Sequence, residues 1–468
     1  MSQPNRNVEL LGWIGFWLVI ITLAALVFGE HALNQDEGVV LNNAWQLWQG
    51  LQLYNPVVDF TAPGATYLVY WTWLIIGVPS YGSAKVAVIF IWLLSALGIT
   101  QLVLRCGGKA IAVMMSVVGW LIMTDYYPLI NHNALSSMAA IWLLVWLIER
   151  RYVLTGVAVA ITILFLQTKG ILLAAMTIVS VLVFDQSRQR AWFNVRTVVL
   201  TATALLVVAL LPWSLLTIIE SWFILPFTQQ YLASSFVQMD IIMIEIILVL
   251  ISVILAWRAK SRAGWILAAS QLALFLSSAH IIDRYHLLIN SFPVLVQLIV
   301  AVTQYWQTLL QYLPRWQQVL LNDLIIVAIG SLFIMPIHRT FQTATIFLDE
   351  ATTYQTLRFP EMQSAQYIYA GPFLPSLYFE LRKPNPFVFS NNMTLCSSAC
   401  QQATLAVFQT VQPEFVILDY DLVAKYGYAP WSQPIDRYIQ SHYIQCQSLG
   451  PNLLLLAQEH CPRLYPKM

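Results

Sequence analysis

The sequence predicts an α-helical polytopic membrane protein that ends in a small α/β domain. The chain of 468 residues is 59% hydrophobic and only 10% charged, whereas soluble domains carry about 25% charged residues. Its mean hydropathy is +0.68. Charged residues and prolines become more frequent after residue 340. We therefore divide the chain into a membrane domain, 1–339, and a C-terminal α/β domain, 340–468.

Apolar runs that suit membrane crossing occur about eleven times before residue 340, since about 20 apolar residues cross a bilayer. They cover 10–29, 84–104, 110–124, 134–148, 153–167, 171–184, 197–218, 240–257, 264–279, 287–305 and 322–338. The first run is too long for a signal-peptide core and lacks a small-residue cleavage site, so we expect it to be a retained span.

Lys and Arg gather on alternate loops, which sets the orientation by the positive-inside rule. With the N-terminus in the cytoplasm, the cytoplasmic loops hold Arg105, Lys109, Arg150, Arg151, Arg188, Arg190, Arg196, Arg258, Lys260, Arg262 and Arg315. The opposite loops hold only Lys85, Lys169 and Arg284. An odd number of spans then places the C-terminal domain outside. We expect a multi-pass protein of the bacterial inner or plasma membrane.

The same rule interprets two ambiguous stretches. Residues 152–184 have basic residues at both ends, so we predict a hairpin with Thr168-Lys169-Gly170 at its outer tip. A crossing at 65–79 would place Arg105 and Lys109 outside. We therefore predict a re-entrant or surface-lying helix there, in the first outer loop.

Short β-like runs alternate with helix-like stretches in the C-terminal domain. The predicted strands are 367–369, 387–389 and 415–418, and the predicted helices are 376–381 and 402–410. Four of the five cysteines lie here, which favours two disulfides outside the cytoplasm. Cys396–Cys400 and Cys446–Cys461 are the pairs we expect among three pairings. A zinc site is the weaker alternative, because CxxC pairs are absent.

Costly polar groups of the membrane domain fall on the outer face. They are Asp36, Glu37, Asp59, Lys85, Asp125, His132, Lys169, Glu220, Asp283, Arg284, Tyr285 and His286. The alternative to a site is a solvated rim of loop residues, or, for Lys85, a side chain that reaches the interface. As a site, Asp36 is a candidate base, and Lys169 and Arg284 are candidate phosphate contacts. Together these groups predict transfer of a group from a lipid phosphate.

Three segments resemble type-C (GT-C) glycosyltransferases, a class that includes protein O-mannosyltransferases, the aminoarabinose transferase and lipopolysaccharide-core sugar transferases. The first outer loop, from Asp36-Glu37-Gly38 through Asp59 and Pro63, is similar to the loop that carries the catalytic acid of that family. Leu166-Gln167-Thr168-Lys169-Gly170 is similar to its L-T-K-G hairpin tip. Asp283-Arg284-Tyr285 followed by Pro293 resembles its entry into a late span.

The resemblance implies an inverting transferase with a polyprenyl-phosphate sugar as donor and a glycan, lipid or protein as acceptor. It implies juxtamembrane helices in the first outer loop. Carried over, the catalytic residues are Asp36 and Glu37, between which the sequence does not choose, and the donor-phosphate contacts are Lys169, Arg284 and Tyr285. The candidate substrate-binding residues are Asp59, Tyr54, Asp125 and His132, with Trp45 and Trp48 as sugar-lining alternatives to packing residues.

The sequence departs from the family at Asn131-His132-Asn133, where many members carry an Asp. No metal ligand set is demanded, so we assign none, although a divalent cation stays open because some relatives use one. A flippase or transporter for lipid-linked glycans, or an assembly factor, is the alternative function, although no inverted repeat is visible. No Walker, dinucleotide or HExxH motif is present, and we expect no nucleic-acid partner.

Overall fold

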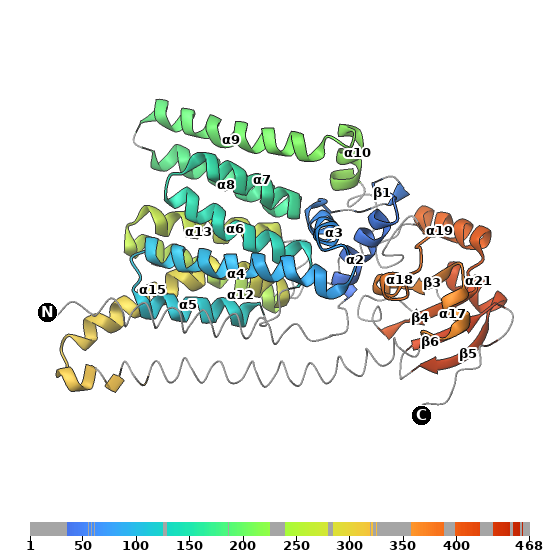
Figure 1. Ribbon diagram of the computed structural model, residues 1–468. Helices are drawn as coiled ribbons and strands as arrows, with labels where there is room; N and C mark the ends of the chain where they lie inside the picture. The colour runs from blue at the N-terminus through green and yellow to red at the C-terminus, as the bar shows by residue number, and fades with distance from the viewer. Residues whose placement is uncertain are drawn as a thin grey trace.

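The computed structural model describes residues 35–54, 56–57, 59, 61–124, 129–185, 187–224, 239–278, 284–318, 320–321, 324, 357–387, 398–421, 434–449, 453–458 and 461. Long helices lie side by side in a bundle, and a small sheet with its helices lies beyond one end (Figure 1). Helices α2 (Gln35–Trp48) and α3 (Gly64–Ile76) lie between the bundle and this sheet.

Nine of the predicted spans fall on described residues, and each contains a helix. The helices are α4 (Tyr81–Arg105), α5 (Ala110–Met123), α6 (His132–Ile148), α7 (Tyr152–Phe165), α8 (Gln167–Phe184), α9 (Arg188–Leu210), α12 (Met239–Ala259), α13 (Arg262–Ser277) and α15 (Phe292–Leu310). Five of them, α4, α8, α9, α12 and α15, are long and apolar enough to cross a membrane on their own. The predicted spans 10–29 and 322–338 lie outside the described residues, apart from position 324.

The predicted hairpin over 152–184 is confirmed, with its turn slightly earlier than expected. Helices α7 and α8 are separated by Leu166 alone, which has an extended backbone (φ −153°, ψ 108°). At the other end the Tyr152 hydroxyl donates to Asp185 Oδ1 at 2.7 Å. A Cβ on Gly170 would lie 2.4 Å from the Ile163 backbone nitrogen. The two helices therefore pack at near-contact distance, and Lys169 stands in the first turn of α8.

The first outer loop contains helix α2, a two-stranded parallel ladder and helix α3. The strands are β1 (Gln52–Leu53) and β2 (Pro56–Val57). The predicted surface-lying helix corresponds to α3, which ends at Gly77 with the left-handed φ of +81° that favours glycine. Trp71, Leu74 and Ile75 of α3 are exposed. This apolar face suits a helix that lies against the lipid interface.

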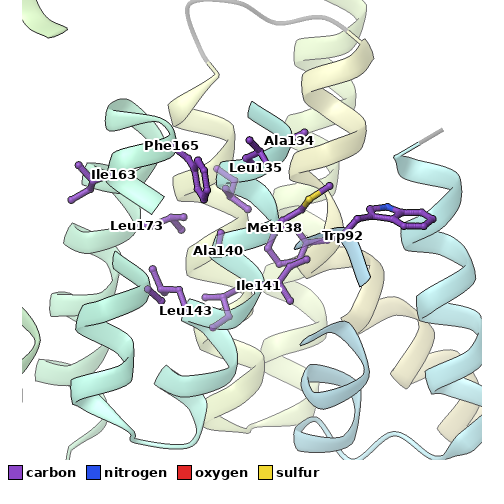
Figure 2. Close-up of a cluster of buried hydrophobic side chains, with 14 of the residues drawn as sticks. Trp92, Ala134, Leu135, Met138, Ala140, Ile141, Leu143, Ile163, Phe165 and Leu173 are labelled. Atoms are coloured by element: carbon purple, nitrogen blue, oxygen red, sulfur yellow. The ribbon is translucent and has the colours of Figure 1, made fainter. Parts of the chain in front are cut away.

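Helix α6 lies at the centre of the bundle core. It contacts α4, α7, α8 and α13, and its buried residues Leu135, Met138 and Ile141 belong to a cluster that also contains Trp92 of α4 and Phe165 and Leu173 of the hairpin (Figure 2). Burial of this many apolar side chains fixes the axial positions of the helices. The first residues of α6 are thereby held at one end of the bundle.

Basic side chains gather at the end of α6 opposite to those first residues. Arg105 and Arg151 both pair with Glu149, at 2.7 and 2.8 Å, and Arg262 donates to the Leu147 carbonyl at 3.2 Å. These residues come from three loops that we predict to be cytoplasmic. The helices thus bring the predicted cytoplasmic loops to one common end.

The C-terminal domain contains a four-stranded sheet in the order β3-β4-β6-β5. Strands β3 (Ile368–Gly371) and β4 (Phe415–Asp419) are parallel, and β6 (Leu453–Ala457) runs antiparallel to both β4 and β5 (Ile444–Leu449). The helices are α17 (Pro360–Ser364), α18 (Pro375–Glu380), α19 (Ser398–Val411) and α21 (Pro434–His442). This is the predicted α/β architecture.

Details of the C-terminal domain differ from the prediction. The strands near 368 and 415 and the helices near 376 and 402 are confirmed. Phe387, predicted to begin a strand, lies in a bend, and 388–389 fall outside the described residues. Strands β5 and β6 were not predicted. The expected Cys446–Cys461 disulfide is present, whereas Cys396 and the Cys400 side chain lie outside the described part.

Candidate functional site

The two adjacent acids of α2 have opposite environments. Asp36 is exposed in the first turn of the helix, and Glu37 is fully buried. Lys85 Nζ lies 2.5 Å from Glu37 Oε1, the Tyr81 hydroxyl donates to Glu37 Oε2 at 3.0 Å, and the Ile130 amide donates to Oε1 at 2.9 Å. Three donors thus occupy most of the roughly four acceptor positions of this carboxylate.

The Glu37–Lys85 pair joins two residues that the sequence singled out. Glu37 was a candidate catalytic residue, and Lys85 was a candidate either for the site or for reaching the interface. The α3–α4 segment instead brings the two together, 48 positions apart, with Lys85 only 4% exposed. A buried charge is tolerated only when it is paired and hydrogen-bonded. The pair therefore anchors the start of α2 to α4, and of the two acids Asp36 alone is exposed.

Asp59 organises a hydrogen-bond network between the second half of α2 and the start of α6. It accepts from Asn43 Nδ2 at 2.8 Å, from the Thr61 amide at 3.0 Å and from the Thr61 hydroxyl at 2.6 Å. Thr61 Oγ1 lies 2.9 Å from His132 Nε2, and His132 Nδ1 lies 3.2 Å from the Phe165 carbonyl. The negative charges of Asp59 and Asp36 both act on His132. Asp59 and His132 thus connect the first outer loop to α6 and α7.

Three consecutive residues at the start of α6 form the centre of the site. Asn131 caps the helix by accepting from the Ala134 amide at 2.7 Å, and its amide nitrogen lies 3.0 Å from the Tyr285 hydroxyl. Asn133 Nδ2 lies 2.8 Å from His286 Nε2. Because an amide nitrogen only donates, His286 Nε2 is the acceptor. These contacts join α6 to α14 (Arg284–Asn290).

Lys169 is fully buried, and its hydrogen-bond partners are neutral. Its ammonium donates to Ser137 Oγ at 2.7 Å and to the Asn133 carbonyl at 3.2 Å. The ion pairs formed within the described residues do not include it. Ser137 in turn contacts Asn290 Oδ1 at 3.3 Å. A buried cation without a counter-ion is costly, and a phosphate is one group that would offset the cost.

Arg284 is exposed at the start of α14. Two residues further along this helix, His286 meets Asn133, whose carbonyl accepts from Lys169. Of the predicted phosphate contacts, Lys169 and Tyr285 therefore touch the start of α6, and Arg284 directly precedes Tyr285 in α14. Asp125 and Asp283 lie outside the described residues.

Tyr54 and Trp45 both make hydrogen bonds that tie the first outer loop to neighbouring segments. The Tyr54 hydroxyl donates to the Thr61 carbonyl at 2.5 Å and accepts from Trp222 Nε1 at 2.9 Å. Burial and the nearby Asp59 raise the pKa of Tyr54 well above its ordinary value. Trp45 donates to the Lys383 carbonyl at 3.1 Å, and Trp48 packs partly buried against the membrane-domain core.

Sequence reasoning missed the roles of Thr61, Asn131, Asn133 and His286. Asn131 and Asn133 are visible in sequence as amides at the start of an apolar run, a position typical of a helix cap. Their contacts with α14 are 153 and 154 positions away. No local pattern indicates contacts of that range.

A divalent cation has no ready ligand set in the part of the chain that the structure describes. No group of three His, Cys, Asp or Glu side chains there is arranged to hold one. Asp36, Asp59 and His132 are near one another, but Asp59 and His132 use their polar atoms on Thr61. We derive no step through a metal.

The fold has counterparts among solved structures. ArnT from Cupriavidus metallidurans bound to undecaprenyl phosphate matches with a TM-score of 0.61 at 12% identity, over 97% of this chain and 99% of that one. AglB, the archaeal oligosaccharyltransferase from Archaeoglobus fulgidus in complex with an inhibitory peptide and a dolichol-phosphate, matches with a TM-score of 0.53 at 11% identity, over 96% and 75%. The chain has the GT-C fold.

Both counterparts are GT-C glycosyltransferases and integral membrane proteins. No protein-family model and no curated protein sequence matches the chain. At these identities the likeness concerns the fold, so the expectation of a GT-C architecture is confirmed, and the chemistry of this chain depends on its own residues.

Proposed function

We propose that this protein is an inverting glycosyltransferase that moves a sugar from a polyprenyl-phosphate donor to an acceptor on the extracytoplasmic side of the membrane. One observation carries the proposal: an exposed acid, Asp36, and a buried cation, Lys169, lie at the same end of the helix bundle. The hydrogen-bond partners of Lys169 are neutral. The two solved counterparts were captured with undecaprenyl phosphate and a dolichol-phosphate, which supports a donor of this class.

Asp36 is the proposed general base. The carboxylate takes the proton of the acceptor hydroxyl or amine as that group attacks the anomeric carbon. The bond between the anomeric carbon and the phosphate oxygen breaks on the opposite face, so the configuration inverts. Polyprenyl phosphate leaves with the bonding electrons. Asp36 suits this role because it is exposed, whereas its neighbour Glu37 is buried and accepts from Lys85, Tyr81 and Ile130.

Lys169, Arg284 and Tyr285 are the proposed contacts of the donor phosphate. Their charge and hydrogen bonds offset the negative charge that grows on the leaving group. The Asn131-His132-Asn133 segment supports them from α6, because it contacts Tyr285, His286 and Lys169. Asp59 and His132 hold the loop that carries Asp36 against α6.

The test is an in vitro transfer assay with purified protein, a panel of polyprenyl-phosphate sugars and a membrane acceptor extract. We expect sugar transfer by the wild type and a fall of about 1,000-fold or more in Asp36→Asn, in line with loss of a base. Asp240→Asn, an exposed acid at the start of α12, is the matched control and should keep full activity. Donor binding without turnover, unchanged in Asp36→Asn, would instead support a flippase, transporter or assembly factor.

A further inference from the structure

The C-terminal domain packs directly on the helix that bears Asp36. Helix α18 lies against α2 at the junction of the two domains (Figure 1). The contact is closest at Gly38, two residues after Asp36, where a Cβ would lie 2.8 Å from both the backbone nitrogen and the Cβ of Ser376. That separation excludes even a methyl group, so the backbones of the two elements touch.

A stack of aromatic rings and one guanidinium extends this contact along α2 and α3. The Arg382 guanidinium lies 5.1 Å from the ring centroid of Trp45 on α2 and 4.6 Å from that of Phe379 on α18. Phe379 is stacked on Trp73 of α3, with centroids 5.3 Å apart and planes 9° apart. Contacts between a guanidinium and the face of an aromatic ring are attractive. Arg382 therefore joins the two domains.

The same segment is tied to the sheet of the C-terminal domain. Lys383, whose carbonyl accepts from Trp45, donates through Nζ to the carbonyls of Gln363 and Ala365, each at 2.6 Å. These carbonyls lie just before strand β3. A continuous path of contacts thus runs from the sheet, through Lys383 and Trp45, to α2.

We infer that the C-terminal domain positions Asp36 by holding helix α2 through the contacts of Gly38 with Ser376 and of Trp45 with Arg382. We call these contacts the clamp, and Arg382 is its positioning residue. The role of Asp36 rests on the proposed function. Helix α2 is held on one side by Glu37 and Lys85, and on the other by Gly38 against Ser376 and by Arg382. The start of a helix otherwise has free backbone amides and frays readily. A shift of about 1 Å in a catalytic group costs about 100-fold in rate.

The test compares Arg382→Ala and Arg382→Lys with Arg358→Ala in the full-length protein. Arg358 pairs at 3.3 Å with Glu380 of α18 and is exposed, so its loss serves as a control that spares the α2 contact. Hydrogen exchange of peptides over 39–48 measures the hold on α2, and transfer assays measure kcat and donor KM. We expect Arg382→Ala to raise exchange there about tenfold and to lower kcat about 10–100-fold with donor KM unchanged, and Arg382→Lys to be intermediate.

The possible outcomes test the clamp and the proposed function separately. Exchange over 39–48 that is equal in Arg382→Ala, Arg358→Ala and the wild type overturns the clamp, as does raised exchange with kcat unchanged in an active enzyme. Raised exchange in a wild type that transfers no sugar leaves the clamp standing and refutes the proposed function. If Arg382→Ala speeds exchange through the whole C-terminal domain, Gly38→Ala decides, because it strains the same contact from the membrane domain.

Discussion

At the scale of single residues, neighbouring side chains differ in what they can do because their directions differ by about 100° on a helix. Asp36 and Glu37 illustrate this. One is exposed beside the network of Asp59 and His132, and the other is buried against Lys85. Lys169 is a second residue whose surroundings its place in the sequence does not reveal. It is buried among neutral oxygens rather than exposed at a hairpin tip.

We predict that Glu37→Gln destabilises the protein by about 3–5 kcal/mol, because it removes the carboxylate that balances the charge of the buried Lys85. The double variant Glu37→Gln/Lys85→Met should regain most of this stability, since it also removes the buried Lys85 ammonium. Thermal unfolding of the purified protein in detergent measures both. Equal stability of Glu37→Gln and the wild type would contradict a structural role for the pair.

We predict that Lys169→Met keeps the fold and weakens binding of polyprenyl phosphate by about 10–100-fold, the range for losing a charged hydrogen bond. Met is close to Lys in length and carries no charge, so it removes the ammonium while keeping most of the buried volume. Binding titration with polyprenyl phosphate measures the effect, with thermal unfolding as the check on folding. Unchanged affinity would assign Lys169 to the packing of α6 against α8 alone.

At the scale of elements, close approach between helices fixes where the polar residues stand. The α7–α8 hairpin turns at a single residue, Leu166, and Gly170 lets α8 touch the backbone of α7. This places Lys169 beside Asn133 and Ser137 of α6. Helix packing therefore determines which side chains meet at the first turn of α6.

We predict that Gly170→Ala lowers the melting temperature or abolishes expression, because its Cβ would lie 2.4–2.5 Å from backbone and side-chain atoms of Ile163. Backbone atoms cannot move aside as a flexible side chain can. Gly82→Ala in α4 is the matched control, since its Cβ would meet nothing within 4 Å. Alanine there should be neutral or stabilise by about 0.5–1 kcal/mol. Similar melting temperatures for the two variants would refute this packing argument.

At the scale of the whole molecule, a cluster of basic residues and the candidate site lie at opposite ends of the bundle. Arg105, Arg151 and Arg262 gather with Glu149 and Leu147 at one end, and the candidate site and the C-terminal domain lie at the other. A charge asymmetry of this kind orients a membrane protein. The Cys446–Cys461 disulfide in the C-terminal domain is consistent with an oxidising outer compartment.

We predict that an impermeant maleimide labels Gln49→Cys but not Gln189→Cys in intact cells, both in a Cys106→Ser background. Both glutamines are exposed, and they lie in predicted outer and cytoplasmic segments respectively. Permeabilised cells, in which both sites should react, provide the control. Labelling of Gln189→Cys alone in intact cells would reverse the orientation and move the site to the cytoplasmic face.

The sequence by itself determined the membrane class, nearly all described helices of the bundle and the α/β nature of the C-terminal domain. These follow from hydropathy and charge, which are local and periodic. It also predicted that Asp36, Lys169 and Arg284 share one face. The missed strand β5 lies at an edge of the sheet and carries polar residues such as Gln445 and Gln447, so its pattern is weak. The missed strand β6 is a short apolar run, which periodicity alone does not assign to a strand.

Only the tertiary structure decided how the residues of that face divide their work. The pairing of Glu37 with Lys85, the contacts of Asn131 and Asn133 with α14, and the docking of Arg382 on Trp45 join positions 48 to 337 apart. Such contacts depend on which helix faces meet after packing, and packing is a property of the whole core. The sequence shows that a side chain is charged, but only the fold decides whether a neighbouring group pairs with that charge.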